Sequence, residues 1–219
     1  MQSLQTLYIL LKKDIALEWR NKFTLGGLLL YVCSTVFVIY MAFNSVKPTT
    51  WLTLFWIVAL FTISNAASRS FVNDFGKQNL FYYQLVAPLP FIFAKIIFNI
   101  LIVWGVTALA VALFSVLLGY PMASTSIFLM AVLQGTAILT VIFTFISAIA
   151  QKAGNASFLL PVLSFPVIIP IVGLLIGITA DAVTGELGAN FWRHNQIIWA
   201  VTALTLALVW VLFPYLWKE

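Results

Sequence analysis

The side chains that could perform catalysis or hold a metal ion are few in this chain. Its 219 residues include a single histidine, His194, and a single cysteine, Cys33. The sequence contains no H-E-x-x-H zinc motif, no G-x-x-x-x-G-K-[ST] phosphate-binding loop and no C-x-x-C-H motif. The chain therefore has no P-loop with which to bind ATP, and any energy from ATP must come from another subunit. We expect that it is not itself an enzyme.

The composition indicates a membrane protein. Hydrophobic residues make up 63% of the chain and charged residues only 8%, whereas a soluble domain carries about 25% charged residues. A helix needs about 20 apolar residues to cross a bilayer, and an open sheet would leave unpaired backbone groups in lipid. We therefore predict an all-α fold with one polytopic membrane domain over residues 1–219. The six expected spans are residues 25–43, 51–67, 95–118, 126–149, 158–178 and 197–215.

Positive charge is distributed unevenly between the two sides of the predicted membrane. If the N-terminus is cytoplasmic, only Lys47 and Arg193 of the 11 Lys and Arg residues fall in outer segments. Cytoplasmic segments of membrane proteins generally carry the excess of basic residues. The sequence therefore predicts that both termini are cytoplasmic. The net charge of +5 reflects this topology and gives no reason to expect nucleic-acid binding.

The first 23 residues have a pattern of their own. Apolar residues recur at three- and four-residue steps: Leu4, Leu7, Leu11, Ile15 and Trp19. Charged residues occupy much of the remaining surface: Lys12, Lys13, Asp14, Glu18, Arg20 and Lys22. This pattern is typical of an amphipathic helix that lies in the cytoplasmic interface and contacts membrane lipids. The alternative is a cytoplasmic extension that packs on a soluble protein.

The longest cytoplasmic loop lies between the second and third predicted spans. Its charged residues alternate with aromatic ones, a pattern that suits lipid headgroups or a protein partner better than water. Phe71 and Phe75 are four residues apart and would share a face of one helix, and Pro88 and Pro90 should end any helix before the third span. The alternative is an aromatic belt that holds the two spans in register. The candidate docking residues are Arg69, Phe71, Asp74, Phe75, Lys77 and Leu80.

The fifth predicted span contains three prolines, Pro161, Pro166 and Pro170. Each proline lacks a backbone donor and crowds the carbonyl four residues earlier. We expect Pro161 to lie in the first helical turn, where the missing donor matters little. The carbonyls freed by Pro166 and Pro170 need other donors, and Ser164 and Thr179 are the nearest candidates.

Gly173 and Gly177 follow these prolines in a G-x-x-x-G spacing, which allows a neighbouring helix to approach closely. Two interpretations stay open for this span. The prolines and glycines could set a fixed kink that shapes the packing, or they could make a bent, adjustable helix at a subunit interface.

No predicted span carries a charged residue near its centre, where the polar residues are Asn99, Gln134 and hydroxyls. Ion-coupled transporters commonly keep an ionisable group there. Asn99 and Gln134 more often join helices through hydrogen bonds. An ion-coupled or stand-alone carrier is therefore an alternative with little support. A membrane scaffold without a transport cycle is a further alternative.

Three stretches together resemble the CcmB family, haem exporter protein B of bacterial cytochrome c maturation. They are the amphipathic N-terminus, the loop SFVNDFGKQNLFYYQLVAPLPFIFAKI and the proline-rich span LLPVLSFPVIIPIVGLLIG. The resemblance implies the permease subunit of a type-2 ATP-binding-cassette (ABC) exporter in the bacterial inner membrane. Its docking loop would then contact a separate ATPase.

The resemblance also implies the partners and the handled ligand. The expected partners are a CcmA-like ATPase, a haem-handling CcmC-like membrane protein, a single-span CcmD-like subunit and a CcmE-like periplasmic haem chaperone. ATP hydrolysis would be coupled to haem delivery or to release of the loaded chaperone. Haem would be transported or handled rather than tightly bound. His194, beside Trp192 and Arg193, is a weak candidate for a haem ligand, because a lone histidine leaves the second axial position empty.

Overall fold

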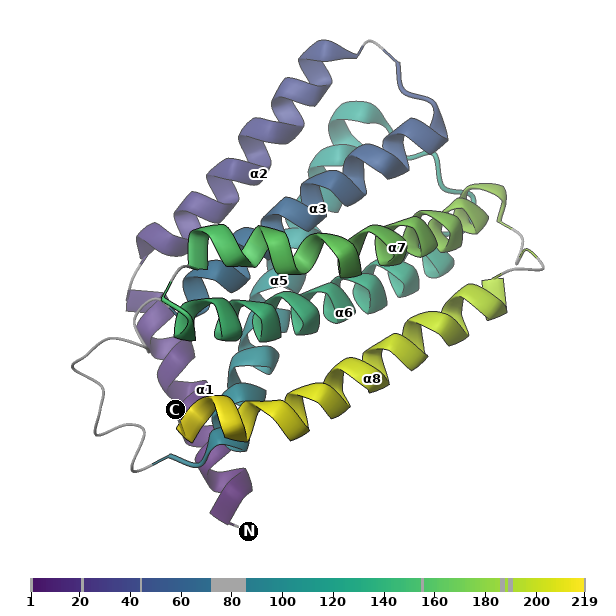
Figure 1. Cartoon of the computed structure of the whole chain (residues 1–219). Helices are drawn as coiled ribbons and strands as arrows, with labels where there is room; N and C mark the ends of the chain where they lie inside the picture. Colours follow the sequence, from purple (N-terminus) through teal and green to yellow (C-terminus); the bar gives the residue numbers. More distant parts are fainter. Residues whose placement is uncertain are drawn as a thin grey trace.

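The computed structural model describes residues 2–20, 22–43, 45–71, 86–154, 156–185, 188 and 191–218. This described part of the chain is all-α, with seven helices and no strand (Figure 1). The helices are α1 (Gln2–Arg20), α2 (Lys22–Ala42), α3 (Pro48–Ser70), α5 (Pro88–Leu118), α6 (Thr125–Lys152), α7 (Ala156–Thr184) and α8 (Phe191–Lys218).

Six of these helices, α2, α3 and α5 to α8, are long and apolar enough to cross a membrane, which confirms the six predicted spans. The largest difference in bounds is at α5, which begins at Pro88 and not near residue 95. Ala87 caps the helix in an extended conformation and Pro88 occupies its first turn, where proline is well tolerated. Pro88 and Pro90 therefore begin the third span instead of preceding it, and Lys95 lies inside a helix.

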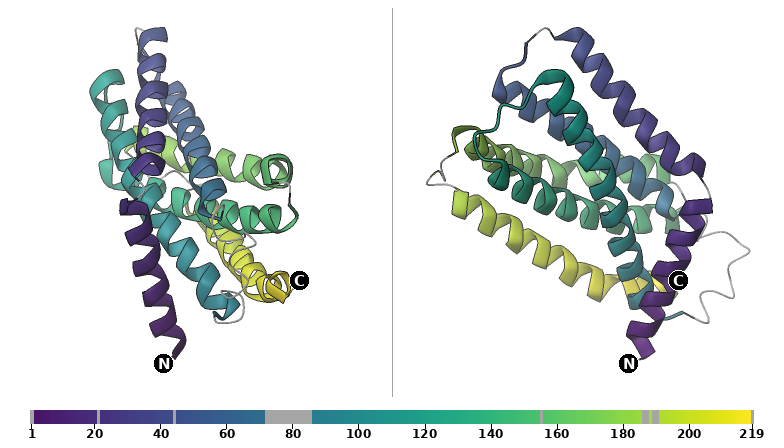
Figure 2. Two further views of the ribbon diagram at one scale, coloured as in Figure 1. Left: turned by 90° about the vertical axis from the view of Figure 1, so that its left-hand side faces the viewer. Right: turned by 180° about the vertical axis from the view of Figure 1, so that it is seen from behind.

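α6 is the central helix of the bundle. Within its apolar stretch 67% of residues are buried, against 17% for α2 and 22% for α8. α6 packs against α3, α5, α7 and α8. α2 and α8 lie at opposite edges of the bundle, as both views in Figure 2 show. Much of the surface of these two edge helices therefore faces lipid or other subunits.

α1 lies along one end of the bundle, where α3 ends, α5 begins and α6 ends (Figure 1). We call this the α1 end; both termini lie there (Figures 1 and 2). α1 packs mainly on α5 and also contacts α2. Leu10 and Asp14 of α1 are buried, whereas Ile15 and Trp19 are exposed. The predicted stripe of Leu7, Leu11, Ile15 and Trp19 is therefore split, and the face toward the bundle contains a carboxylate.

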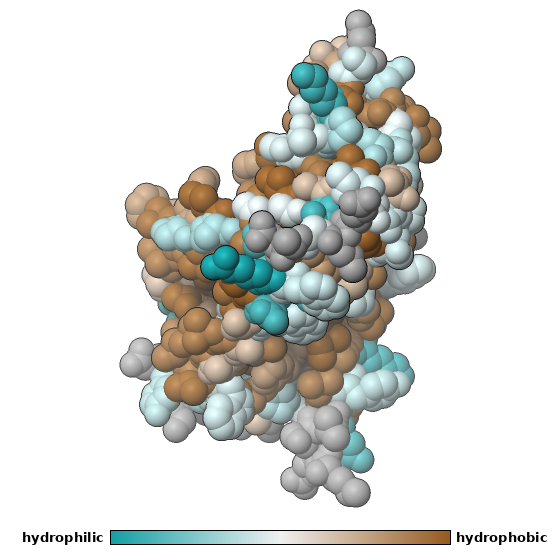
Figure 3. Space-filling view, turned by 90° about the vertical axis from the view of Figure 1, so that its right-hand side faces the viewer, coloured by the Kyte–Doolittle hydropathy of each residue, from teal (hydrophilic) through white to brown (hydrophobic). Residues whose placement is uncertain are grey.

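Aromatic side chains fill the core near the opposite end. Trp51 stacks on Phe55 with ring centroids 5.6 Å apart and meets the rings of Phe114 and Phe128 edge-on at 5.2 Å and 5.7 Å. The indole of Trp51 also donates a hydrogen bond to the carbonyl oxygen of Gly119 at 3.0 Å. Figure 3, which looks onto this end, shows apolar surface interrupted by only a few strongly hydrophilic side chains.

Polar contacts join α6 to its neighbours. The Nδ2 atom of Asn99 in α5 donates to Oγ1 of Thr144 at 3.0 Å, and Oγ of Ser147 donates to the carbonyl oxygen of Ala67 in α3 at 2.9 Å. The prediction that Asn99 joins helices is therefore confirmed. The side-chain nitrogen of Gln134 is buried and has no hydrogen-bond partner among the described residues.

α7 is one continuous helix with all three prolines inside it. Because it begins at Ala156, Pro161 lies beyond the first turn and not within it as expected. The Oγ atom of Ser164 donates to the carbonyl oxygen of Pro161 at 3.2 Å, and Thr179 donates to the carbonyl of Leu175 at 2.7 Å. Both hydroxyls therefore donate to carbonyls within their own turns. The carbonyls freed by Pro166 and Pro170 belong to Val162 and Pro166, and the expectation that Ser164 and Thr179 donate to them is wrong.

Candidate functional site

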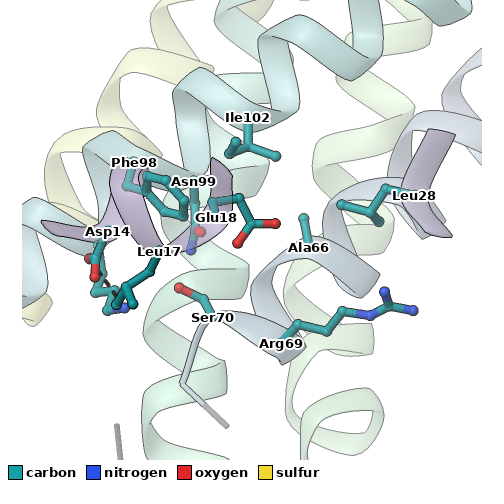
Figure 4. A pocket seen from close by; sticks show the side chains of 11 residues that line it. Asp14, Leu17, Glu18, Leu28, Ala66, Arg69, Ser70, Phe98, Asn99 and Ile102 are labelled. Atoms are coloured by element: carbon teal, nitrogen blue, oxygen red, sulfur yellow. Dashed lines mark ion pairs between the residues drawn. The ribbon is translucent and has the colours of Figure 1, made fainter. Parts of the chain in front are cut away.

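A polar cavity of about 90 Å³ lies at the α1 end, enclosed by α1, α2, α3 and α5 (Figure 4). The polar side chains of its wall come from three helices that are far apart in the sequence. The cavity is lined by Asp14, Leu17, Glu18, Leu28, Ala66, Arg69, Ser70, Lys95, Phe98, Asn99 and Ile102. Buried charged groups are rare in membrane proteins and often indicate a functional site.

A buried ion pair closes one side of this cavity. The Nζ atom of Lys95 lies 3.2 Å from Oδ2 of Asp14, and the two side chains are 7% and 5% exposed. Lys13 reaches the other carboxylate oxygen of Asp14 at 3.3 Å. The ammonium of Lys95 also lies 5.9 Å from the centre of the Phe91 ring. Removal of one partner from such a buried pair leaves an uncompensated charge, so the pair fixes α1 against α5.

Glu18, one turn after Asp14 on α1, directs its carboxyl group into the cavity (Figure 4). Burial raises the pKa of this carboxyl above its ordinary value. The positive charges of Lys95 and Arg69 lower the pKa, and the negative charge of Asp14 raises it further. Because burial has the largest effect, the uncharged form of Glu18 is favoured more than in water.

Two neutral groups complete the polar wall. The Oγ atom of Ser70 is buried and has no hydrogen-bond partner among the described residues. Asn99 is 2% exposed, and its amide nitrogen is already used by Thr144. The Asn99 amide keeps a second N–H donor and its acceptor oxygen. Because Lys95 and Arg69 also line it, the cavity presents both donors and acceptors.

Arg69, near the end of α3, lines the cavity but its side chain extends away from Glu18 (Figure 4). The side chain is exposed. A Cβ atom built on Gly27 of α2 would lie 3.2 Å from a guanidinium nitrogen of Arg69. The absence of a side chain at position 27 therefore lets Arg69 lie close to α2.

The two helix ends that flank residues 72–85 meet next to this cavity. Phe71, which follows the last residue of α3, is fully buried, and its ring lies 6.3 Å from that of Phe91 in α5. The ring of Phe71 is therefore packed inside this chain, and its contact with an ATPase stays a prediction. α3 ends at Ser70, and the chain turns so that Phe71 joins an apolar cluster with Phe91 and Phe213.

The family model named CcmB protein matches residues 5–215 of the chain. The chain belongs to the CcmB family. The family provides the membrane component of the haem exporter and cytochrome c maturation ABC system, and it associates with other components of that system. No curated protein matches the sequence.

Four of the predicted docking residues of this CcmB-family chain lie outside the described residues: Asp74, Phe75, Lys77 and Leu80. Of the predicted set, the structure describes only Arg69 and Phe71. It places both beside the polar cavity and its adjoining apolar cluster.

The proline-rich helix of the CcmB-family chain borders a second, apolar cavity of about 290 Å³ between α3 and α7. Pro161 lines this cavity together with Trp56 and Phe165. Pro166 and Pro170 are exposed. A Cβ atom on Gly173 would meet nothing within 4 Å, so Gly173 does not serve close packing inside the chain.

Gly177 serves close packing, and its neighbour is His194 of α8. A Cβ atom at position 177 would lie 3.1 Å from both Cε1 and Nδ1 of the imidazole. The Nδ1 atom is buried and has no hydrogen-bond partner among the described residues. The imidazole ring of His194 is therefore positioned by the packing of α8 against α7.

Sequence reasoning did not identify the polar cavity. Asp14 and Glu18 are four residues apart on α1, and Lys95 and Asn99 are four residues apart on α5. Each pair therefore shares a helix face. The sequence pattern places Asp14 and Glu18 on the polar face of an interfacial helix and Lys95 at the first residue of the third span, so it does not predict that they meet.

Proposed function

We propose that this CcmB-family chain couples ATP hydrolysis by a separate CcmA-like ATPase to haem delivery or to release of a haem-loaded CcmE-like chaperone. The observation that carries the proposal is the linkage of three elements at the α1 end. The end of α3 and the start of α5 meet through Phe71 and Phe91, and α1 is joined to α5 through Asp14 and Lys95. A force applied to residues 72–85 would therefore act on three helices together.

The same end of the bundle is the proposed cytoplasmic side. Most basic residues fall in segments at this end, which supports an N-in, C-in orientation in the bacterial inner membrane. Trp19 is 77% exposed, as expected for an anchor among lipid headgroups. An ATPase in the cytoplasm would then meet the loop directly.

The exposed prolines of α7 support a second part of the proposal. Pro166, Pro170 and Gly173 lie on the surface of the chain, where a neighbouring subunit could contact them. Proline inside a helix weakens the backbone hydrogen bonding of the preceding turn. We infer that α7 adjusts its shape at an interface with the CcmC-like or CcmD-like subunit during the ATPase cycle.

Co-purification tests the proposal. A tagged chain extracted from membranes should retain the ATPase, and c-type cytochromes should fail to mature when that ATPase cannot hydrolyse ATP. Normal maturation with the inactive ATPase would favour a scaffold. Movement of a solute by the purified chain in liposomes, without any ATPase, would favour a carrier.

A further inference from the structure

α1 has an outward face, which turns away from the bundle and consists of Tyr8, Lys12, Ile15, Trp19 and Arg20. All five side chains are exposed. We propose that this outward face binds anionic phospholipids, with their acidic headgroups at Lys12 and Arg20. Three observations carry the proposal: the division of charge between the two sides of α1, the position of α1 at the membrane surface and the exposed apolar side chains beside the two cations.

The spacing of these residues makes a continuous stripe along the helix. Tyr8, Lys12, Ile15 and Trp19 follow one another at steps of four, three and four residues, which place them on one side of an α-helix. The opposite side, which includes the buried Asp14, packs on α5. α1 therefore has one side that is fixed to the bundle and one side that the rest of the described chain leaves uncovered.

The charges of α1 are divided between these two sides. Its two acidic residues both face inward: Asp14 is paired with Lys95, and the carboxyl group of Glu18 points into the polar cavity (Figure 4). Lys12 and Arg20 are exposed, and neither forms an ion pair with a described residue. The outward face therefore carries two positive charges and no negative one. This is the charge that complements a membrane surface rich in acidic headgroups.

The connection of α1 to the first span places it at the membrane surface. α1 ends at Arg20 and α2 begins at Lys22, and the apolar part of α2 begins at Leu25. Five helical residues rise about 7.5 Å, so Arg20 lies close to the start of the hydrocarbon core. The rest of α1 runs along the end of the bundle (Figure 1). A soluble acidic protein would have to displace headgroups from this position, whereas lipids already occupy it.

The apolar side chains of the outward face suit the same position. Tyr8 is 67% exposed and Trp19 is 77% exposed. Each ring combines a large apolar body with one polar atom, as is typical of side chains at a membrane–water interface. Ile15 is exposed between them. These three residues would contact the upper parts of the acyl chains, while the long stems of Lys12 and Arg20 let their charges reach the headgroups.

The two cations predict a preference among lipids. Each Lys or Arg close to an anionic surface strengthens binding about fivefold. Phosphatidylcholine presents the same phosphate as phosphatidylglycerol but balances it with a choline cation, and the apolar contacts are the same for both lipids. We therefore expect phosphatidylglycerol to be favoured next to α1 by about tenfold or more.

Quenching of a fluorophore by brominated lipids tests this preference in the full chain. The fluorophore is attached through Ala16→Cys, because Ala16 is exposed and lies four residues from both Lys12 and Arg20; Cys33→Ser removes the natural thiol. The chain is reconstituted, without an ATPase, in vesicles of equal phosphatidylglycerol and phosphatidylcholine with identical acyl chains, and bromine is placed on one lipid or the other. Equal quenching by the two lipids would overturn the proposal and would favour a soluble acidic partner for this face.

Two double variants locate the preference. Lys12→Gln with Arg20→Gln removes both cations of the outward face and should reduce the preference to about twofold or less. Lys47→Gln with Arg193→Gln is the matched control, since it removes the same charge from exposed positions at the opposite end of the bundle. The control should keep the wild-type preference. A preference that survives the α1 double variant, or that the control loses equally, would show that the outward face is not its source.

Charge conservation and salt provide the last arm. Lys12→Arg with Arg20→Lys keeps both cations and should keep the preference. Added salt should weaken the preference, because it screens exposed charges, whereas the apolar contacts should keep both lipids near the fluorophore. A preference that is unchanged between low and high salt would show that it does not arise from charge, and the assignment to anionic headgroups would be wrong.

Discussion

The Nζ atom of Lys95 and the Oδ2 atom of Asp14 lie 3.2 Å apart, with their side chains 7% and 5% exposed. The two residues are on α5 and α1, so the contact joins the N-terminal helix to the span that follows residues 72–85. A helix bound to the interface by apolar contacts alone could slide along the bundle. A buried charge pair fixes its position, because a shift would separate the buried ammonium of Lys95 from the Asp14 carboxylate.

Loss of one member of this pair should destabilise the fold. We expect Asp14→Asn to lower the free energy of unfolding by about 3–5 kcal/mol, since it leaves Lys95 buried without its carboxylate. Lys95→Met should be milder, because Lys13 still lies 3.3 Å from Asp14. The double variant should lose less than the sum of the two. Thermal unfolding in detergent measures all three, and strictly additive losses would show that the pair is not coupled.

Removal of the Glu18 charge should stabilise the fold, whereas removal of the Asp14 charge should destabilise it. Because burial raises its pKa from 4.5, the folded state binds more protons than the unfolded state. The resulting stability is present below pH 4.5 and is lost as the pH rises through the raised pKa. Glu18→Gln should therefore increase the melting temperature above that interval, in detergent without lipid, and have little effect below it. A difference between wild type and variant that does not vary with pH would contradict this expectation.

Gly135 should tolerate no side chain. A Cβ atom there would lie 2.5 Å from Cδ2 of Leu175 and 2.6 Å from Cη2 of Trp56, where α6 meets α7 and α3. Gly135→Ala should destabilise the chain by about 1–3 kcal/mol through overpacking. Gly105→Ala in α5 is the matched control, since nothing lies within 4 Å of its Cβ position. Equal melting temperatures for the two variants would refute the predicted clash.

Phe71 and Phe75 should differ in the effect of truncation. Phe71→Ala removes a fully buried ring and should cost about 3–5 kcal/mol of stability. Phe75→Ala should leave the fold intact and weaken ATPase binding by about tenfold or more, and Lys77→Ala should weaken it less. Pull-down of the ATPase, normalised to the amount of folded chain, separates these effects. Wild-type pull-down by Phe75→Ala would exclude Phe75 as a docking anchor.

Reporter fusions should show which side of the membrane each loop occupies. Fusions after Gly119 and Gly188 are expected to be active outside, and fusions after Gly76 and Gly154 inside. The physical reason is the excess of Lys and Arg in the segments assigned to the cytoplasm. The reverse pattern would place the α1 end outside and remove the basis for ATPase docking there.

The spans could be predicted from the sequence because each is recognisable from its own residues. A run such as 126–149 is long and apolar wherever its neighbours lie, and the bilayer requires its backbone groups to bond within the helix. Their ends were less predictable. Proline is compatible both with a helix stop and with a first helical turn, and only the structure shows that Pro88 begins α5 and that Lys95 lies inside it.

By itself, the sequence determined that the chain folds in a bilayer, that it is all-α and that it has six spans. These features depend on composition and on local hydrogen bonding. Only the tertiary structure decided which polar groups meet. Asp14, Ser70 and Lys95 come from three helices, and they share a cavity because α1 packs across α5 beside the end of α3. The burial of Phe71 was decided in the same way. A charge or ring on an amphipathic helix can face water, lipid or another helix, and its free energy in each environment depends on neighbours that are distant in the sequence.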